Sequence, residues 1–191
     1  MRTLTVWILL GLGCGGPTYV RDMDVKNLDE YAMSTGLDRR DIDRLYDENT
    51  RSLMESAVVT QWKKEPPVVA IFPITNETSE HVGSQLDALL SKLETQFVNG
   101  GFAQVVSRER QKQLIGEVEA QRGGAFDPSG AANYGKQLGA RFFVTGKLHD
   151  SAERTKGERR VQYFLFMQVV DVETGVIRWQ NEAKLTKGLV Q

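Results

Sequence analysis

The run 68–74 is the feature that most constrains how this chain can fold. Its sequence, Val-Val-Ala-Ile-Phe-Pro-Ile, is rich in β-branched and aromatic residues and directly follows two prolines at 66–67. A short run of this kind is typical of a β-strand that is covered on at least one face. The polar residues 76–81 follow at once. We interpret the run as the first core strand and the polar residues as a loop in which Thr78 or Ser79 caps the next helix.

The residues after this strand alternate between helical and strand patterns. Apolar side chains recur at helical spacing in three segments, and short apolar runs predict four more strands. We expect helices over about 79–99, 107–122 and 128–138, and strands over 102–106, 141–149, 161–172 and 176–185. The charged residues 151–160 are expected to form a hairpin tip and 173–175 a tight turn. In the last strand, Ile177 and Trp179 are expected on the buried side.

This order of elements implies a sheet that carries helices. The helices need an apolar surface for their leucine-rich stripes, and the last three strands are expected to form an antiparallel meander. We therefore predict an α/β (α+β) fold with a mixed, largely antiparallel sheet of about five strands. If the helices cover one face only, the other face includes Phe143, Phe164 or Phe166. That face would then be covered by the helix that precedes the domain, or it would form a partner surface.

A charged helix precedes this domain. Asp38 is a suitable cap, and apolar residues from Ile42 to Val58 recur at helical spacing, which predicts one long helix to about Gln61. Its other positions alternate in charge and are expected to face water.

The N-terminus has the pattern of an export signal. One basic residue and an apolar run over 4–12 are too short to span a bilayer but fit a secretory signal. The sequence Leu-Gly-Leu-Gly-Cys that ends at Cys14 resembles a bacterial lipobox, in which cleavage leaves a lipidated cysteine, and Gly15 fits sorting to the outer membrane. An ordinary signal peptide with an incidental cysteine is the alternative. We therefore divide the chain into a signal peptide (1–13), a lipidated flexible tether (14–37), a charged amphipathic helix with a linker (38–65) and a globular domain (66–187).

Composition and motifs argue against several kinds of site. The 24 basic and 25 acidic residues leave a net charge of −1, which does not favour a nucleic-acid surface. Cys14 is the only cysteine, which excludes an internal disulfide and a cysteine-rich metal site. His81 and His149 lack the spacing of metal ligands, and nucleotide-binding and nucleophile motifs are missing. We expect no catalytic residue, metal, cofactor or small-molecule substrate.

Several short motifs from 34 to 187 together resemble one family by their order and spacing. They are Ser34–Ile42, Val68–Ile71, Asn76–His81, Gly101–Arg108, Asp127–Pro128, Gly135–Arg141, Val144–Leu148 and Asp171–Trp179. In this respect the chain resembles the LpoB-type lipoproteins. The resemblance implies an outer-membrane lipoprotein, anchored through Cys14 and facing the periplasm, that binds a class A penicillin-binding protein and stimulates peptidoglycan synthesis. It also implies a fold related to the amino-terminal domain of TolB and to the secretion lipoprotein CsgG.

Two other functions stay open. A secretion or envelope-assembly subunit like CsgG would need a stretch that can form membrane strands, whereas residues 163–172 are apolar on both faces and are typical of a buried strand. A periplasmic enzyme of another class would need a convergent catalytic site, which the sequence does not reveal.

A function by contact favours a partner surface on the C-terminal meander. Basic side chains occur there beside aromatic ones and are expected to form one basic, partly aromatic patch; alternatively they are ordinary solubilising charges. The residues of this predicted patch are Arg141, Phe143, Lys147, His149, Arg154, Arg159, Arg160 and Tyr163.

Overall fold

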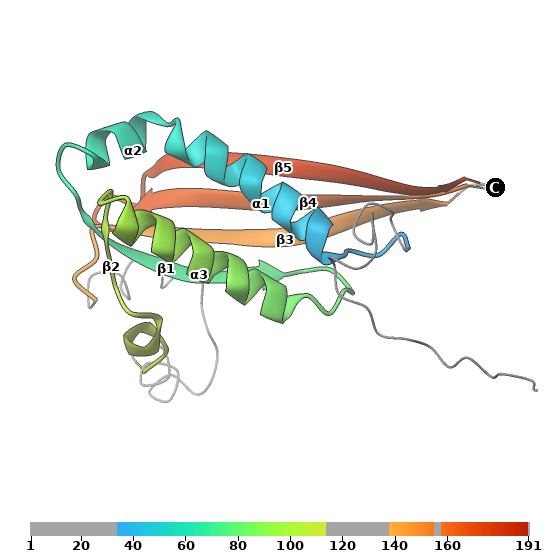
Figure 1. The fold of residues 1–191 in the computed structure, drawn as a ribbon, viewed down its shortest axis with the longest axis horizontal. Helices are drawn as coiled ribbons and strands as arrows, with labels where there is room; N and C mark the ends of the chain where they lie inside the picture. Colours follow the sequence, from blue (N-terminus) through green and yellow to red (C-terminus); the bar gives the residue numbers. More distant parts are fainter. Residues whose placement is uncertain (1–33, 114–137, 155–157, 191) are drawn as a thin grey trace, which may run out of the picture. The chain divides into compact units, whose positions relative to one another are not determined.

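One mixed sheet of five strands organises the part of the chain that the computed structural model describes, residues 34–113, 138–154 and 158–190 (Figure 1). The strands lie in the order β2-β1-β3-β4-β5. Strand β1 pairs in parallel with β2 and β3, whereas β3, β4 and β5 form an antiparallel meander. Their bounds are Val68–Asn76 (β1), Gln104–Val105 (β2), Phe142–Arg154 (β3), Glu158–Asp171 (β4) and Ile177–Val190 (β5). The predicted fold class is confirmed.

Three helices pack on one face of this sheet. They are α1 (Arg39–Met54), α2 (Ala57–Trp62) and α3 (Gly83–Asn99), and Figure 1 shows α1 and α3 side by side over the strands. Apolar side chains of all three helices and of β1, β3, β4 and β5 form a single buried cluster, in which Leu45, Leu93 and Leu165 are at most 1% exposed. Helix α1 thus covers the same face as α3, and the alternative that it covers the opposite face is wrong.

The single helix predicted over 38–61 is two helices. The start is as expected, because the side chains of Asp38 and Asp41 each accept the other's backbone N–H at 3.0 Å. At Ser56 the hydroxyl donates to the Leu53 carbonyl at 2.6 Å and accepts the Val59 N–H at 3.3 Å. The Ser56 side chain thus bonds backbone groups at the end of α1 and at the start of α2. The helix can therefore be interrupted there without leaving those groups unpaired.

The predicted side-chain cap of α3 is also wrong. The helix begins at Gly83, after Val82, with no side-chain capping bond. Instead, the N–H and hydroxyl of Thr78 both donate to Asn76 Oδ1, at 3.1 and 2.8 Å, and Asn76 Nδ2 donates to the Glu80 carbonyl at 2.7 Å. The polar segment therefore stabilises its own turn.

Some strand lengths and the burial of Ile177 differ from the sequence-based expectation. Strand β2 has two residues rather than the five predicted over 102–106. The charged segment 151–160 is mostly strand, since β3 extends to Arg154 and β4 begins at Glu158. Ile177 is 49% exposed, whereas Trp179 packs against the main cluster. The pairing register shifts between Val169 and Val170, so Ile177 and Trp179 do not share a face.

Within the described residues, only part of the opposite face of the sheet is covered. At the end where β3 begins, a second buried cluster contains Ala70, Phe72, Leu138, Ala140, Phe143, Val170 and Val172. Residues 108–113 are helical, as predicted for a helix that starts at Ser107. The rest of that predicted helix, the third predicted helix up to residue 137 and the predicted signal peptide lie outside the described residues, as does most of the predicted tether. The remaining face of β3, β4 and β5 carries the candidate site.

Candidate partner-binding surface

Nine side chains form three rows across β3, β4 and β5 on the face opposite the helices. Directly paired residues of neighbouring strands share a face, so the register defines the rows. They are Thr145–Gln168–Gln180, Lys147–Phe166–Glu182 and His149–Phe164–Lys184. We call these nine residues the open face. The side chains on β4 are half-buried, and those on β5 are exposed.

Aromatic side chains occupy the centre of the open face and charged side chains its edges. The ring of His149 stacks on that of Phe164, with the centroids 4.9 Å apart and the planes at 11°. The His149 Nδ1 atom is buried and has no hydrogen-bond partner among the described residues. Lys147 Nζ lies 3.9 Å from Glu77 Oε2, and both side chains are 48% exposed, so this ion pair contributes little to stability. Lys147 is therefore available to a partner.

Arg141 lies outside the open face and holds the turn between β4 and β5. Its guanidinium donates to Asp171 Oδ2 at 3.1 Å and to Glu173 Oε2 at 3.0 Å. Burial alone would raise the pKa of Asp171, but the N–H groups of Thr174 and Glu173 and the charge of Arg141 lower it below the ordinary value. Gly175 completes the predicted tight turn with φ of 70°.

Two aromatic members of the predicted patch are buried. Tyr163 lies on the helix-covered face and is 2% exposed. Phe143 belongs to the second cluster and packs edge-on against Phe72, with the centroids 5.7 Å apart. The structure therefore does not bring the eight predicted residues together.

The basic residues of the hairpin lie further along β3 and β4 than the open face. Arg154 lies opposite Arg159 in the backbone register of β3 and β4, at the end of these strands next to the hairpin turn. Arg160 is exposed. Only Lys147 and His149 of the predicted patch belong to the open face. The sequence prediction missed Glu182 and Lys184, although their alternation with the buried Ala183 and Leu185 was a usable signal.

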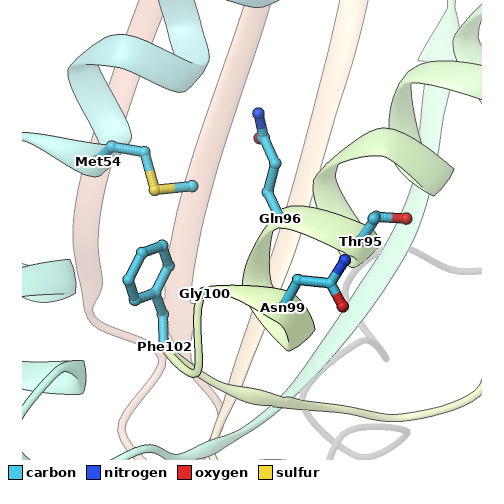
Figure 2. A pocket seen from close by; sticks show the side chains of 6 residues that line it. All are labelled: Met54, Thr95, Gln96, Asn99, Gly100 and Phe102. Carbon is cyan, nitrogen blue, oxygen red and sulfur yellow. The ribbon is translucent and has the colours of Figure 1, made fainter.

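A shallow groove of about 460 Å³ lies on the other side of the sheet, where α1 and α3 end (Figure 2). The thioether of Met54 and the ring of Phe102 point toward each other across it, and the amides of Gln96 and Asn99 lie on the α3 side. Thr95 and Gly100 complete the lining. None of these six side chains is an acid, a base or an activated nucleophile, so the groove lacks the groups that acid–base or nucleophilic catalysis needs.

Two further properties concern the described residues only. They contain no group of three or more His, Cys, Asp or Glu side chains placed to hold a metal ion. None of their helices has both the length and the apolar character needed to cross a membrane. Cys14, the predicted lipidation site, lies outside them.

Comparison with known proteins gives a match over most of the chain. A family model described as the peptidoglycan-synthase activator LpoB matches residues 41–185. The LpoB C-terminal domain from Escherichia coli is similar in structure, with 18% identity, a TM-score of 0.48 and coverage of 76% of this chain and 98% of that chain. The corresponding domain from Salmonella enterica has 17% identity, a TM-score of 0.42 and the same coverage, 76% and 98%. The lipoprotein GNA1162 from Neisseria meningitidis has 14% identity, a TM-score of 0.43 and coverage of 64% and 84%. No curated relative matches the chain.

Proposed function

Because the chain belongs to the LpoB family of peptidoglycan-synthase activators, we propose that it binds a class A penicillin-binding protein and raises its rate of peptidoglycan synthesis through protein contact. The family match extends from the first turn of α1 to the second half of β5, and so includes residues of all five strands. The activator contributes a binding surface, and all catalytic groups belong to the synthase.

The open face is the surface that supports this proposal. Phe164 and Phe166 lie side by side on β4 at its centre and are half-buried, which leaves an apolar area at the surface of the described part of the chain. Lys147, Lys184 and Glu182 surround them on β3 and β5. Aromatic anchors inside a polar rim are the common composition of transient protein interfaces. We infer that the synthase binds here, with Lys147 and His149 as the contacts retained from the predicted patch.

Anchoring completes the proposed function. Lipidation of Cys14 would hold the chain at the outer membrane, facing the periplasm, where the synthase makes its product. Attachment to a surface raises the effective concentration of the activator near its partner. No cofactor, metal or small-molecule substrate is part of the proposal.

A binding and activity assay tests it. The full chain in detergent is mixed with purified class A penicillin-binding proteins, and co-precipitation and glycan-strand synthesis are measured with and without it. Binding together with faster synthesis is expected. No binding and unchanged synthesis with every class A enzyme of the source cell would reject the activator function.

A pair of charge reversals tests the surface separately. Lys147→Glu and Lys184→Glu change opposite edges of the open face and are expected to weaken binding while the protein stays folded. Lys64→Glu, in the turn after α2 and away from the open face, is the matched control, since Lys64 is an exposed lysine. Equal binding by all three variants would place the contact elsewhere.

A further inference from the structure

Lys187 is a buried cation that joins β5 to the start of α1. The residue is 7% exposed. Its ammonium donates to the Gly36 carbonyl at 2.7 Å, to Asp38 Oδ2 at 3.1 Å and to Asp41 Oδ2 at 2.6 Å. An ammonium has three N–H donors, so all of them are used. Asp38 and Asp41 also cap α1, and the same two carboxylates therefore fix both the helix start and its attachment to β5.

A second set of contacts holds the residues just before Asp38. The hydroxyl of Tyr163 lies 3.0 Å from the Thr35 carbonyl and 3.2 Å from Glu80 Oε1. Glu80 also packs against Gly36, where an added Cβ would lie 3.0 Å from its carboxylate. Strands β4 and β5 and the loop between β1 and α3 thus converge on residues 35–38.

These contacts add to an attachment that is already extensive. Helix α1 contributes Ile42, Leu45, Tyr46 and Leu53 to the main cluster, all at most 2% exposed. Burying a charged pair usually gives no more stability than well-packed apolar side chains of the same size. The contacts of Tyr163 and Lys187 instead fix the backbone carbonyls of Thr35 and Gly36, which contribute no apolar side chain to either buried cluster. These contacts therefore act mainly at the junction between the residues before Thr35 and the folded domain.

We propose that Lys187, Tyr163 and Glu80 form a latch on residues 35–41 that passes pulling force from the N-terminal segment into β4 and β5. A pull at residue 34 acts on the latch before it acts on α1. Without the latch, the same pull would separate α1 from the sheet turn by turn, starting at Asp38. The latch thereby keeps the domain folded when its N-terminal segment is under tension. It is independent of the partner contact, because the open face lies on the other side of the sheet.

Single-molecule pulling of the full chain tests the latch. The chain is produced without export, so that Cys14, the only natural cysteine, keeps a free thiol, and handles are attached at Cys14 and at an introduced Ser151→Cys in β3, which is exposed. In this background, Lys187→Met is expected to add an early low-force step with a gain of up to about 75 Å, the extended length of residues 34–55. Lys184→Met, an exposed position on the opposite face of the same strand, is expected to unfold like the parent.

Hydrogen exchange covers the case in which Lys187→Met fails to fold. Tyr163→Phe removes only the hydroxyl and is expected to speed exchange of the amides of residues 35–42 by about tenfold, with the amides of β3 and β4 unchanged. The same first rupture force in Lys187→Met and Lys184→Met would overturn the latch. Uniform acceleration across the sheet in Tyr163→Phe would also overturn it, since that result indicates a general loss of stability. Neither result depends on synthase binding.

Discussion

His149 and Phe164 lie opposite each other on β3 and β4, and their rings stack in parallel with the centroids 4.9 Å apart. The pair fixes one flat aromatic surface on the open face, because each ring restricts the rotamers of the other. We expect Phe164→Ala to weaken binding of the synthase by about 30-fold, or about 2 kcal/mol, as for a central interface anchor. Affinity is measured by calorimetry or interferometry, and folding by the thermal midpoint.

Val98→Ala is the matched control for this prediction. Val98 is an apolar side chain on α3 that is 53% exposed, on the helix side of the sheet. Its truncation is expected to leave affinity unchanged. If Phe164→Ala binds as tightly as Val98→Ala, the aromatic centre of the open face is not the contact.

Asn49 is expected to be essential for the attachment of α1. The side chain is completely buried; Nδ2 donates to the Leu45 carbonyl at 3.0 Å and to the Leu165 carbonyl at 2.8 Å, and Oδ1 accepts from Asn181 at 3.1 Å. Asn49→Leu removes these bonds, including the one from the amide of Asn181. We expect a loss of about 2–4 kcal/mol in the free energy of unfolding, measured with urea. Asn99→Ala, at an exposed position, is expected to change it by less than about 0.5 kcal/mol.

The order of elements and the buried face of β3 were predictable because both follow from local sequence patterns. Val144 and Leu148 alternate with Thr145, Lys147 and His149, and a strand with one buried face must alternate in this way. The break at Ser56 was missed because a serine at that position also fits a continuous helix. The register shift at Val169 depends on the partner strand, which periodicity within one segment does not report.

The candidate site was less predictable than the fold. The predicted patch combined residues by charge and by closeness in the sequence, so it placed Tyr163 beside His149. Tyr163 has the same parity in β4 as the buried Leu165 and Met167, and this pattern would have assigned it to the helix-covered face. The ion pair of Arg141 with Asp171 links residues 30 positions apart and has no local signal.

Arg141→Glu is expected to act on stability rather than on binding alone. The new carboxylate would lie beside Asp171 and Glu173, and the buried Asp171 would lose its cationic partner. We expect the free energy of unfolding to fall by about 1–3 kcal/mol. The loss is smaller than for a fully buried ion pair, because Arg141 is half-exposed and water screens its charge. Lys147→Glu, whose ion pair is exposed on both sides, is expected to change stability by less than about 0.5 kcal/mol. Comparable urea midpoints for the two variants would contradict this assignment.

Gly146 is expected to tolerate no side chain. It lies in β3, where an added Cβ would be 2.5 Å from the Phe166 carbonyl oxygen and 3.2 Å from Met167 Cγ. Because the first contact is with backbone, relief requires the strands to separate, and Gly146→Ala is expected to cost about 2–3 kcal/mol or more. At Gly83, the first residue of α3, an added Cβ meets nothing within 4 Å. Gly83→Ala is therefore expected to stabilise the protein by about 0.4–1 kcal/mol. Equal effects of the two variants would show that backbone separation at Gly146 is not required.

If the latch forms, the free energy of unfolding should fall at low pH because of Asp38. Burial alone would raise the pKa of Asp38, but the Asp41 N–H and the Lys187 ammonium lower it below the ordinary value. The unfolded chain therefore takes up a proton at a higher pH than the folded protein does. The stabilisation is complete above the unfolded pKa of about 3.9 and is lost as the pH falls through the lowered pKa of the folded state.

Lys187→Met separates this contribution from that of other carboxylates. Without the ammonium, the pKa of Asp38 is expected to return toward its ordinary value, so the free energy of unfolding should fall less steeply between about pH 5 and pH 2 than in the parent. Asp171, whose pKa is also lowered, keeps its partners in both proteins and gives the same slope in each. Urea titrations at a series of pH values measure the difference. Parallel curves for the parent and Lys187→Met would contradict coupling between Lys187 and Asp38, because a stabilising ion pair must change the proton affinity of its carboxylate.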